Sequence, residues 1–357
     1  MRIAQIAPLY EAVPPRLYGG TERVVAHLCD ALCEAGHEVT LFAAGESRTR
    51  ARLVAAREQA LRLDGRPLKS DVAAHLNQLQ MVKRQAHRFD ILHFHTDLLH
   101  FPLFEAEAGK TLTTVHGRLD IPELADVYQR WSQFGLASIS HSQRAPLPAA
   151  NWLDTVYHGL SPRQYTSVTG NRRSYLAFLG RLAPEKRPDL AIRIALAAGW
   201  PLHIAAKVDP ADAAYFESVI RPLLNHPQVQ YIGEISDAEK SDFLGHAAAL
   251  LFPIDWPEPF GLVMIEAMAC GTPVIAWNRG SVPEIIEHGV TGFIVDSQQE
   301  ALAALTRLAG LDARLIRRSF EQRFSAAVMA RAYSDLYTKL LAQATAEMST
   351  PRTAVAP

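Results

Sequence analysis

RIAQIAPLYEAVPPRLYGGTERVVAHLCDALCEAGHEVTLFAA, residues 2–44, decides the fold class of this 357-residue chain. It begins with a short apolar run, RIAQIA, that has the length of a buried strand. A loop with prolines and glycines leads to TERVVAHLCDALCEAG, where apolar residues recur at helical spacing. Thr21 is of a type that caps helices and Gly36 of a type that ends them, so we expect a helix over 21–36. The run EVTLFAA then predicts a second strand.

A strand, a helix and a second strand in this order are the unit of parallel sheets. The alternation continues with a predicted helix at 71–88 and strands at 89–95, 111–117 and 137–142. The polar, aperiodic segment Ser161–Arg173 is the predicted linker. The alternation then restarts, with strands predicted at 175–180, 202–208, 229–234, 250–254, 273–277 and 292–296, helices between them, and helices from 298 to about 346. The sequence therefore predicts two α/β domains, each a Rossmann-like, doubly wound parallel sheet, facing each other across a cleft.

The composition excludes several classes of protein. Hydrophobic residues make up 48% of the chain, and a formal net charge of -1 gives no overall attraction for nucleic acid. We find no apolar run long enough to span a membrane and no signal peptide, so we expect a cytoplasmic protein. Between residues 48 and 88, ten Lys and Arg residues face three acidic ones. This flank is expected to be a solvated face, to lie near an acidic substrate, or to make weak peripheral contact with an anionic membrane.

The cysteines and histidines predict no metal site. Cys29, Cys33 and Cys270 form no CxxC pair, which suits a reducing compartment. His93 and His95 alternate on a predicted strand and so face the same side, but no third ligand accompanies them in the sequence. We therefore expect neither a metal nor another cofactor.

Candidate site residues gather in DWPEPFGLVMIEAMACGTPVIAW, residues 255–277. A helix is predicted to begin near Leu262, which places Glu258 in the loop before it and Glu266 in its first turns. The backbone N–H groups near that helix start are expected to point into the cleft, where they suit an anion or a hydroxyl group. The two carboxylates suit the vicinal hydroxyls of sugars, one at each end of a ligand.

The segment FLGRLAPEKRPDL offers the cations that a phosphate needs. It is predicted as strand, turn and helix, with Arg181 and Lys186 in the turn and Pro188 in the first helical turn. A guanidinium fork and a flexible ammonium are a suitable pair for a diphosphate, and we expect no acidic residue to neutralise both. Cations at a helix start are unfavourable unless an anion is bound there.

Together, these motifs resemble a known family. GRLAPEK (180–186) and EPFGLVMIEAMACGTPVIA (258–276), with GGTERVV (19–25), TVHG (114–117) and the pattern at 280–293, are similar to the family 4 retaining glycosyltransferases of the GT-B fold. The resemblance covers nearly the whole chain, and the two glutamates match that family's paired-glutamate motif. It implies an acceptor-side domain of residues 1–165, a donor domain of residues 166–330, and a C-terminal helix of about residues 331–357 that crosses back.

The resemblance also implies roles for single residues. Arg181 and Lys186 would contact the pyrophosphate of a nucleotide sugar, and Glu266 its ribose hydroxyls. Glu258 would lie near the transferred sugar, and His116 near that sugar and the acceptor side of the cleft. Backbone contacts would come from Gly19 and Gly20 toward the phosphates, and toward the sugar from Phe260, Gly261 and Leu262.

Two positions depart from the family pattern. Lys207 stands where the family often carries glycines, and it is either a further phosphate or acceptor contact or a solvated loop residue. His158-Gly159 stands where Asn-Gly is common. The nucleobase would be held largely by backbone groups, near Val208 and 231–234.

The predicted function is transfer of a hexose from a nucleoside diphosphate sugar to a hydroxyl of a small-molecule or glycan acceptor, with retention at the anomeric carbon. The loop EAVPPRLYGGTERVV and the segment HFHTDL resemble a glucosyltransferase-like subgroup, which implies glucose, with UDP as its carrier. A sugar-nucleotide epimerase of the same fold and a non-catalytic nucleotide-sugar-binding protein remain open alternatives. A dinucleotide oxidoreductase is disfavoured, because GxGxxG does not follow the first strand.

Overall fold

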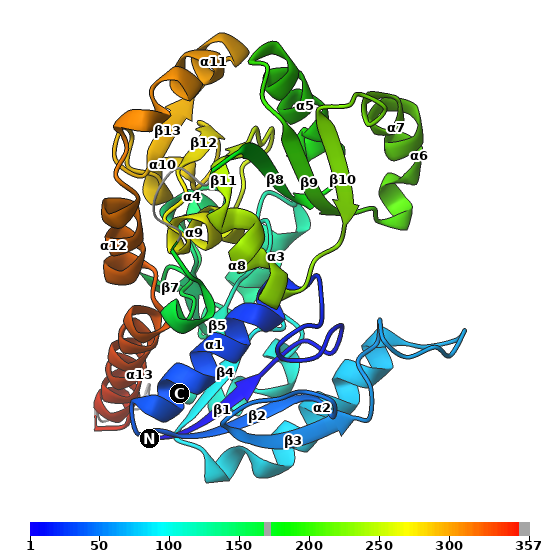
Figure 1. Cartoon of the computed structure of the whole chain (residues 1–357). Coiled ribbons are helices and arrows are strands. Elements are labelled where there is room, and N and C mark those ends of the chain that lie inside the picture. Colours follow the sequence, from blue (N-terminus) through cyan, green and yellow to red (C-terminus); the bar gives the residue numbers. More distant parts are fainter. Residues whose placement is uncertain (168–172, 350–357) are drawn as a thin grey trace.

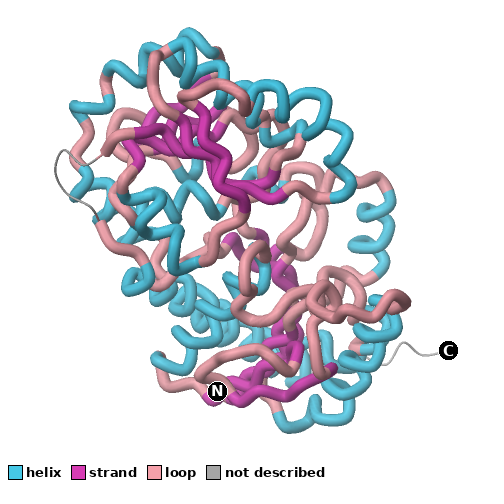
Figure 2. Tube along the Cα trace, turned by 45° about the vertical axis from the view of Figure 1, so that its right-hand side comes forward, coloured by secondary structure: helices cyan, strands magenta, loops and turns pink. Residues whose placement is uncertain are grey.

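The structure, a computed structural model, describes residues 1–167 and 173–349. Two α/β domains lie one above the other (Figure 1), and Figure 2 shows their strands as two separate layers. The expected class, two doubly wound parallel sheets, is confirmed. Of the predicted linker, residues 168–172 lie outside the described residues, as do residues 350–357 of the C-terminal tail.

The first sheet has seven parallel strands in the order β3-β2-β1-β4-β5-β6-β7. They are β1 (Arg2–Ile6), β2 (Glu38–Ala44), β3 (Arg52–Arg57), β4 (Ile91–Phe94), β5 (Thr111–Thr114), β6 (Gly135–Ser138) and β7 (Trp152–Thr155). The α-helices of this half are α1 (Gly20–Glu34), α2 (Asp71–Gln85), α3 (Glu123–Arg130) and α4 (His141–Arg144). The sequence prediction missed the edge strands β3 and β7, because they are half-exposed and lack the continuous apolar run of a strand buried on both faces.

The second sheet has six parallel strands in the order β10-β9-β8-β11-β12-β13. They are β8 (Tyr175–Arg181), β9 (Leu202–Lys207), β10 (Val229–Gly233), β11 (Ala247–Phe252), β12 (Val274–Trp277) and β13 (Gly292–Val295), and all six were predicted. Their α-helices are α5 (Pro188–Ala197), α8 (Asp237–Gly245), α9 (Leu262–Ala269), α10 (Val282–Ile285), α11 (Gln298–Thr306) and α12 (Ala313–Arg323).

Two helix predictions need correction. The helix expected between the strands predicted at 202–208 and 229–234 is α6 (Ala213–Tyr215), a π-helical turn (Phe216–Ile220) and α7 (Arg221–Leu223), because Pro222 has no N–H for the regular hydrogen-bond ladder. Helix α1 begins at Gly20 with Gly19 as its N-cap and no side-chain cap, so the prediction that Thr21 caps it is wrong. Short 3-10 turns complete the chain: 86–88, 101–103, 105–110, 162–164, 184–186, 210–212 and 308–310.

Helix α13 (Ala326–Ser349) follows the second domain in sequence but packs on the first, beside α1 in Figure 1. Its residues Met329, Tyr333 and Tyr337 lie in one apolar core with α1. The two segments that connect the domains also pair with each other, since the Leu160 N–H donates to the Phe324 carbonyl at 2.9 Å. The domains are therefore joined twice.

Both sheets change winding direction between their central strands, at β1/β4 and at β8/β11. In open parallel sheets, ligands bind at the carboxyl ends of the strands beside such a switch point. Loops that follow β1, β4, β5, β8, β9 and β11 line a single cleft between the domains. Within residues 1–167 and 173–349, no helix has the length and hydropathy to span a bilayer.

Candidate functional site

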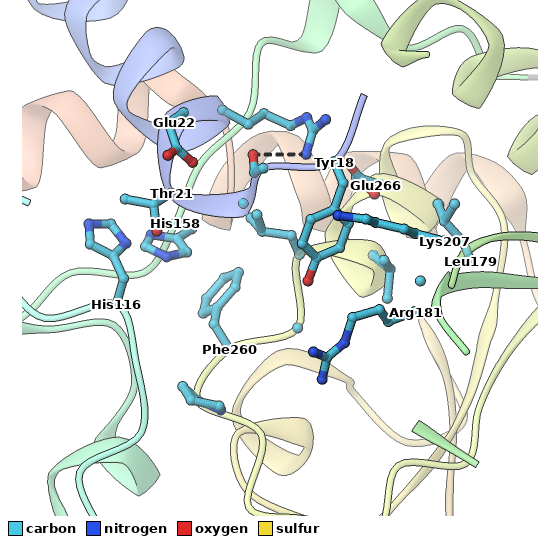
Figure 3. Close-up of a pocket in the computed structure, with 18 of the residues that line it drawn as sticks. Tyr18, Thr21, Glu22, His116, His158, Leu179, Arg181, Lys207, Phe260 and Glu266 are labelled. Carbon is cyan, nitrogen blue, oxygen red and sulfur yellow. Dashed lines mark hydrogen bonds between the residues drawn. The ribbon is translucent and has the colours of Figure 1, made fainter. Parts of the chain in front are cut away.

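The cleft has a volume of about 560 Å³, which suits a ligand of small-molecule size. Both domains line it (Figure 3). Its lining includes all the residues predicted to contact the phosphates, the ribose, the transferred sugar or the acceptor: Gly19, Gly20, His116, Arg181, Lys186, Lys207, Glu258, Phe260, Gly261, Leu262 and Glu266. Residues from five separate stretches of the sequence therefore meet in one place. Of the positions predicted near the nucleobase, Glu234 lines the cleft and Val208 does not.

The start of helix α9 forms one wall of the cleft. Gly261 is its N-cap, with a left-handed φ of 78°. This backbone conformation strains residues that have a Cβ, so the position favours glycine. The preceding loop is held by two hydroxyls: Ser140 donates to the Pro259 carbonyl at 2.6 Å and Ser281 to the Phe260 carbonyl at 2.8 Å. The Met264 N–H donates to the Gly261 carbonyl at 3.0 Å, whereas the N–H groups of Leu262 and Val263, the first two of α9, have no helical acceptor and so remain for a ligand.

Glu258 lies in this loop with a buried side chain. Its carboxylate forms an ion pair with Lys186 and accepts a hydrogen bond from the Trp256 indole at 2.8 Å. Gly280 packs directly against its backbone, since a Cβ at Gly280 would lie 2.4 Å from the Glu258 N and O atoms. The carboxylate is thus held by two side chains, and the backbone of Glu258 is held by Gly280.

Arg181 projects from the end of β8 and is surrounded by acids. It forms an ion pair with Glu185, and its guanidinium lies 3.7 Å from Asp209 and 3.8 Å from Asp212. Lys186 pairs with Glu258 instead, so each cation has carboxylate partners of its own, and among the described residues no single acidic residue pairs with both, as predicted. The pairing of Glu185 with Arg181 was not predicted, because the two side chains meet only through the conformation of the turn that follows β8. The buried Nε of Arg181 has no partner among the described residues.

Tyr18, which the sequence reasoning missed, reaches across from the loop of the first domain. Figure 3 shows its ring between Lys207 and the centre of the pocket, with Arg181 below. The Lys207 ammonium lies 5.5 Å from the ring centroid, within the range of a cation–π contact, and 3.2 Å from Asp209. Lys207 is thus a cleft residue rather than a solvated one, and Tyr18 is its neighbour from the other domain.

Glu266 is the most deeply buried carboxylate of the cleft, with 1% of its surface exposed. Its Oε1 accepts hydrogen bonds from the Lys240 ammonium at 2.8 Å and the Tyr165 hydroxyl at 3.3 Å. Lys240 is itself buried, and it was not among the predicted residues. A carboxylate with one oxygen anchored in this way can still offer the other to a ligand.

Histidines line the opposite side of the pocket from Arg181 and Lys207, as Figure 3 shows for His116 and His158. The rings of these two histidines stack with centroids 5.2 Å apart. Burial lowers the pKa of His116 to about 3 and holds that of His158 well below its usual value, so both are neutral at pH 7. The Nδ1 atoms of both are buried and make no hydrogen bond among the described residues.

A chain of hydrogen bonds decides which nitrogen of His116 carries the proton. Gln5 donates its amide N–H to the Tyr337 hydroxyl at 3.0 Å, so its carbonyl accepts from His95 Nε2 at 2.8 Å. Neutral His95 then has a bare Nδ1, which accepts from His116 Nε2 at 2.8 Å. His116 Nδ1 is consequently a hydrogen-bond acceptor, suited to a hydroxyl group of a ligand.

Two carboxyl groups of the first domain also line the cleft without having been predicted. Asp97 follows β4 in a left-handed conformation, φ 49°, which is strained for a non-glycine residue. The surrounding walls of the cleft raise the pKa of Asp97 to about 6. Burial likewise raises the pKa of Glu22, which lies in the quoted GGTERVV motif. In the sequence, these two carboxyl groups were indicated only by the motifs that contain them, GGTERVV for Glu22 and HFHTDL for Asp97.

Within the part of the chain that the structure describes, no group of three or more His, Cys, Asp or Glu residues is arranged to hold a metal ion. His93 and His95 do share a face, with ring centroids 4.2 Å apart. His93 is, however, engaged on both nitrogens, by the Tyr337 hydroxyl and the Thr114 hydroxyl, each at 2.7 Å. Its nitrogens are therefore committed to the packing of α13.

Both halves of the chain match known families. Residues 18–157 match the family described as Glycosyltransferase Family 4, and residues 167–322 match the family described as Glycosyl transferases group 1. Together with the two facing parallel sheets, these matches support a family 4 glycosyltransferase of the GT-B fold.

Particular proteins resemble the chain to different extents. AviGT4, a glycosyltransferase involved in avilamycin A biosynthesis, is 25% identical with a TM-score of 0.71, over 96% of this chain and 98% of that one. The HepE protein of Anabaena, solved in complex with UDP and glucose, shares the fold at 17% identity and a TM-score of 0.69, over 95% and 99%. The D-inositol 3-phosphate glycosyltransferase of Mycobacterium bovis is 32% identical over 154 residues, 40% of this chain. The matched region spans only 21% to 32% of the length of the curated relatives.

Proposed function

We propose that this chain transfers glucose from UDP-glucose to an acceptor hydroxyl, with retention at the anomeric carbon and without a metal ion. One observation carries the proposal. A single cleft is lined by the cations Arg181, Lys186 and Lys207, by the start of α9 and by two buried carboxylates, Glu258 and Glu266. A nucleoside diphosphate sugar offers a partner for each of these: phosphates for the cations and the helix start, and ribose and sugar hydroxyls for the carboxylates.

The pairing of the cations suggests how the donor is accommodated. Arg181 and Lys186 form ion pairs with Glu185 and Glu258. A diphosphate carries more charge than a carboxylate and offers bidentate oxygens to the guanidinium, so we expect it to displace both carboxylates. Glu258, once released from Lys186, is free to accept hydrogen bonds from the hydroxyls of the transferred sugar.

Once the donor is bound, the main contribution that the transfer reaction needs from the protein is stabilisation of the charge on the leaving phosphate. The bond between the anomeric carbon and the β-phosphate oxygen breaks, and the acceptor oxygen forms the new bond on the same face. The acceptor's proton passes to the departing phosphate oxygen, so no carboxylate nucleophile is needed. Arg181, Lys186 and the N–H groups near Gly261 stabilise the growing phosphate charge, with about 3 kcal/mol typical of one such donor. His116 Nδ1 accepts a hydrogen bond from a sugar hydroxyl.

Several observations support the proposed donor, the independence from a metal ion and the proposed position of the acceptor. The fold is shared with HepE, whose structure was solved with UDP and glucose. Three side-chain cations, Arg181, Lys186 and Lys207, line the cleft and would neutralise the phosphates in place of a metal. The acceptor enters from the side of the first domain, where Tyr10, Arg62 and Asp97 line the cleft. A cytoplasmic location stays a prediction.

A thermal-shift screen tests the donor site. UDP, GDP, ADP, their glucose and mannose conjugates and NAD are added with and without EDTA. Ligand at 100 times its Kd should stabilise the protein by about 2.7 kcal/mol. We expect UDP and UDP-glucose to raise the unfolding temperature, with and without EDTA. Arg181→Ala should abolish this increase. Arg221→Ala is the matched control, because Arg221 pairs with Glu217 outside the cleft. Stabilisation by NAD alone, or by none of these ligands, would refute the proposal.

Turnover distinguishes the alternatives that remain. The epimerase has one observation in its favour, since neutral His116 and His158 and the carboxyl of Glu22 give the first-domain wall possible acid and base groups. It would convert UDP-glucose into an epimeric UDP-sugar without an acceptor, which NMR of the anomeric protons detects. A glycosyltransferase instead releases UDP in proportion to an α-linked product.

A further inference from the structure

A buried arginine of the first domain joins two parts of the cleft. Arg23 lies in α1 and is 5% exposed. Its guanidinium donates to the Leu17 carbonyl at 2.7 Å and to the Gly19 carbonyl at 3.2 Å, which holds the loop before α1. Its Nε donates to both carboxylate oxygens of Asp237, at 2.9 and 3.0 Å. Asp237 opens helix α8 of the second domain, so one side chain fastens the glycine loop to the opposite domain.

The contacts continue from Asp237 toward Glu266. Lys240 lies one turn further along α8, 6% exposed, with its ammonium 3.2 Å from Asp237 and 2.8 Å from Glu266 Oε1. Positions three apart share a helix face, which is why one helix serves both neighbours. Charges alternate along the resulting chain, Arg23–Asp237–Lys240–Glu266, which we call the charge chain.

Joining two domains through the charge chain has a large desolvation cost. Buried ion pairs lose hydration, and apolar residues of similar size often stabilise a protein at least as well. Removing one member, by contrast, leaves an uncompensated buried charge. Such a chain therefore serves to fix positions more than to add stability. Arg23, Lys240 and Glu266 line the cleft, and Asp237 connects the first two.

The two oxygens of Glu266 differ in their surroundings. Oε1 is taken by Lys240 and Tyr165. Among the described residues, Oε2 makes no hydrogen bond with another side chain or the backbone. The carboxylate therefore has a defined orientation, with one oxygen held by the protein and one remaining for a hydroxyl group.

We propose that Arg23 and Lys240 are positioning residues of the donor site, which orient Glu266 toward the ribose of a nucleoside diphosphate only while the glycine loop is docked on α8. The inference rests on the proposed function. Donor recognition in the second domain thus depends on an arginine of the first. Substitution of Arg23 should weaken recognition of the ribose hydroxyls even though Arg23 itself does not touch them.

The test compares ribose with deoxyribose. Kd is measured by calorimetry for UDP, GDP and ADP and for dUDP, dGDP and dADP, which lack the 2′-hydroxyl. One hydrogen bond to a charged group gives the wild type a preference of about tenfold or more for the ribonucleotide. Glu266→Gln should bring the ratio close to one. Arg23→Gln and Lys240→Met should lower it to below about threefold.

This ratio separates positioning from a merely structural role. A variant that only loosens the fold weakens ribo- and deoxyribonucleotide together and leaves the ratio unchanged. Asp237→Asn, a milder change in the middle of the charge chain, is the second variant in case Arg23→Gln does not fold. Arg57→Gln is the matched control, because Arg57 pairs with Asp64 at 2.6 Å in the same domain but away from the cleft.

Different failures have different meanings. A wild-type ratio retained in Arg23→Gln, Asp237→Asn and Lys240→Met, with Glu266→Gln still losing it, would overturn this inference alone. A wild type that binds nucleoside diphosphates without preference for ribose would also overturn it and leave the donor site standing. A wild type that binds none of the six would overturn the proposed function together with the inference.

Discussion

Lowering the pH from 7.5 to 5.5 should destabilise the first domain through its buried histidines. Burial holds the pKa values of His93, His95 and His158 well below their usual range and lowers that of His116 to about 3. In the unfolded chain each histidine has a pKa of about 6.5. Below that value the unfolded state binds more protons than the folded state. The stability is therefore fully present above about pH 6.5 and is lost as the pH falls.

The magnitude follows from this linkage. Each neutral buried histidine contributes about 1.4 kcal/mol per pH unit below its unfolded pKa, so the four lose about 5 to 6 kcal/mol by pH 5.5. Asp97 acts in the opposite sense, because desolvation raises its pKa to about 6, but its side chain is exposed to solvent, so it offsets only a small part of this loss. His27 and His100, whose pKa values burial also lowers, add to the loss. A net loss of at least about 4 kcal/mol is expected, a large part of the stability of a domain.

Urea unfolding, followed by circular dichroism at several pH values, measures the effect. With a slope of about 2 kcal/mol per M, the midpoint should fall by about 2 M. The double variant His116→Asn/His158→Asn should show roughly half of the four-histidine effect. A free energy of unfolding that stays constant within about 1 kcal/mol from pH 7.5 to 5.5 would refute the reasoning, because it would mean that these histidines are protonated in the folded protein.

Three further predictions concern the cleft. Gly280→Ala places a Cβ 2.4 Å from the Glu258 backbone, so kcat with UDP-glucose should fall by about tenfold or more at unchanged secondary structure, and a wild-type kcat would contradict the packing. Gln5→Leu removes the group that sets the tautomers of His95 and His116, so the KM for UDP-glucose should rise severalfold while the Kd of UDP alone stays unchanged. A parallel loss of UDP binding would indicate that Gln5 has a structural role instead. Treatment with EDTA should leave the initial rate within about twofold of that of the untreated enzyme, because the proposed phosphate-binding cations are side chains. If EDTA lowers the rate and Mg²⁺ or Mn²⁺ restores it, the enzyme needs a metal.

The predicted site residues were found because they occupy particular local contexts. Arg181, Lys207 and His116 stand at or just beyond the ends of strands, and parallel strands bring such ends to one edge. Their partners could not be found in the same way. Asp209 and Asp212, for example, approach Arg181 only because β9 pairs with β8 in register, with Lys207 opposite Arg181. Tyr18 was missed because its loop has no periodic pattern to locate it.

The sequence by itself determined the two-domain α/β architecture, since strand and helix periodicity and burial are local properties. It also located the motifs that line the cleft. Only the tertiary structure decided which charges meet there: Arg23 and Asp237 are 214 positions apart, and His93 and Tyr337 are 244 apart. Such contacts depend on the order of the strands, on the docking of one domain against the other and on the return of α13. A local pattern contains no information about those three arrangements, because each is set by packing between distant segments.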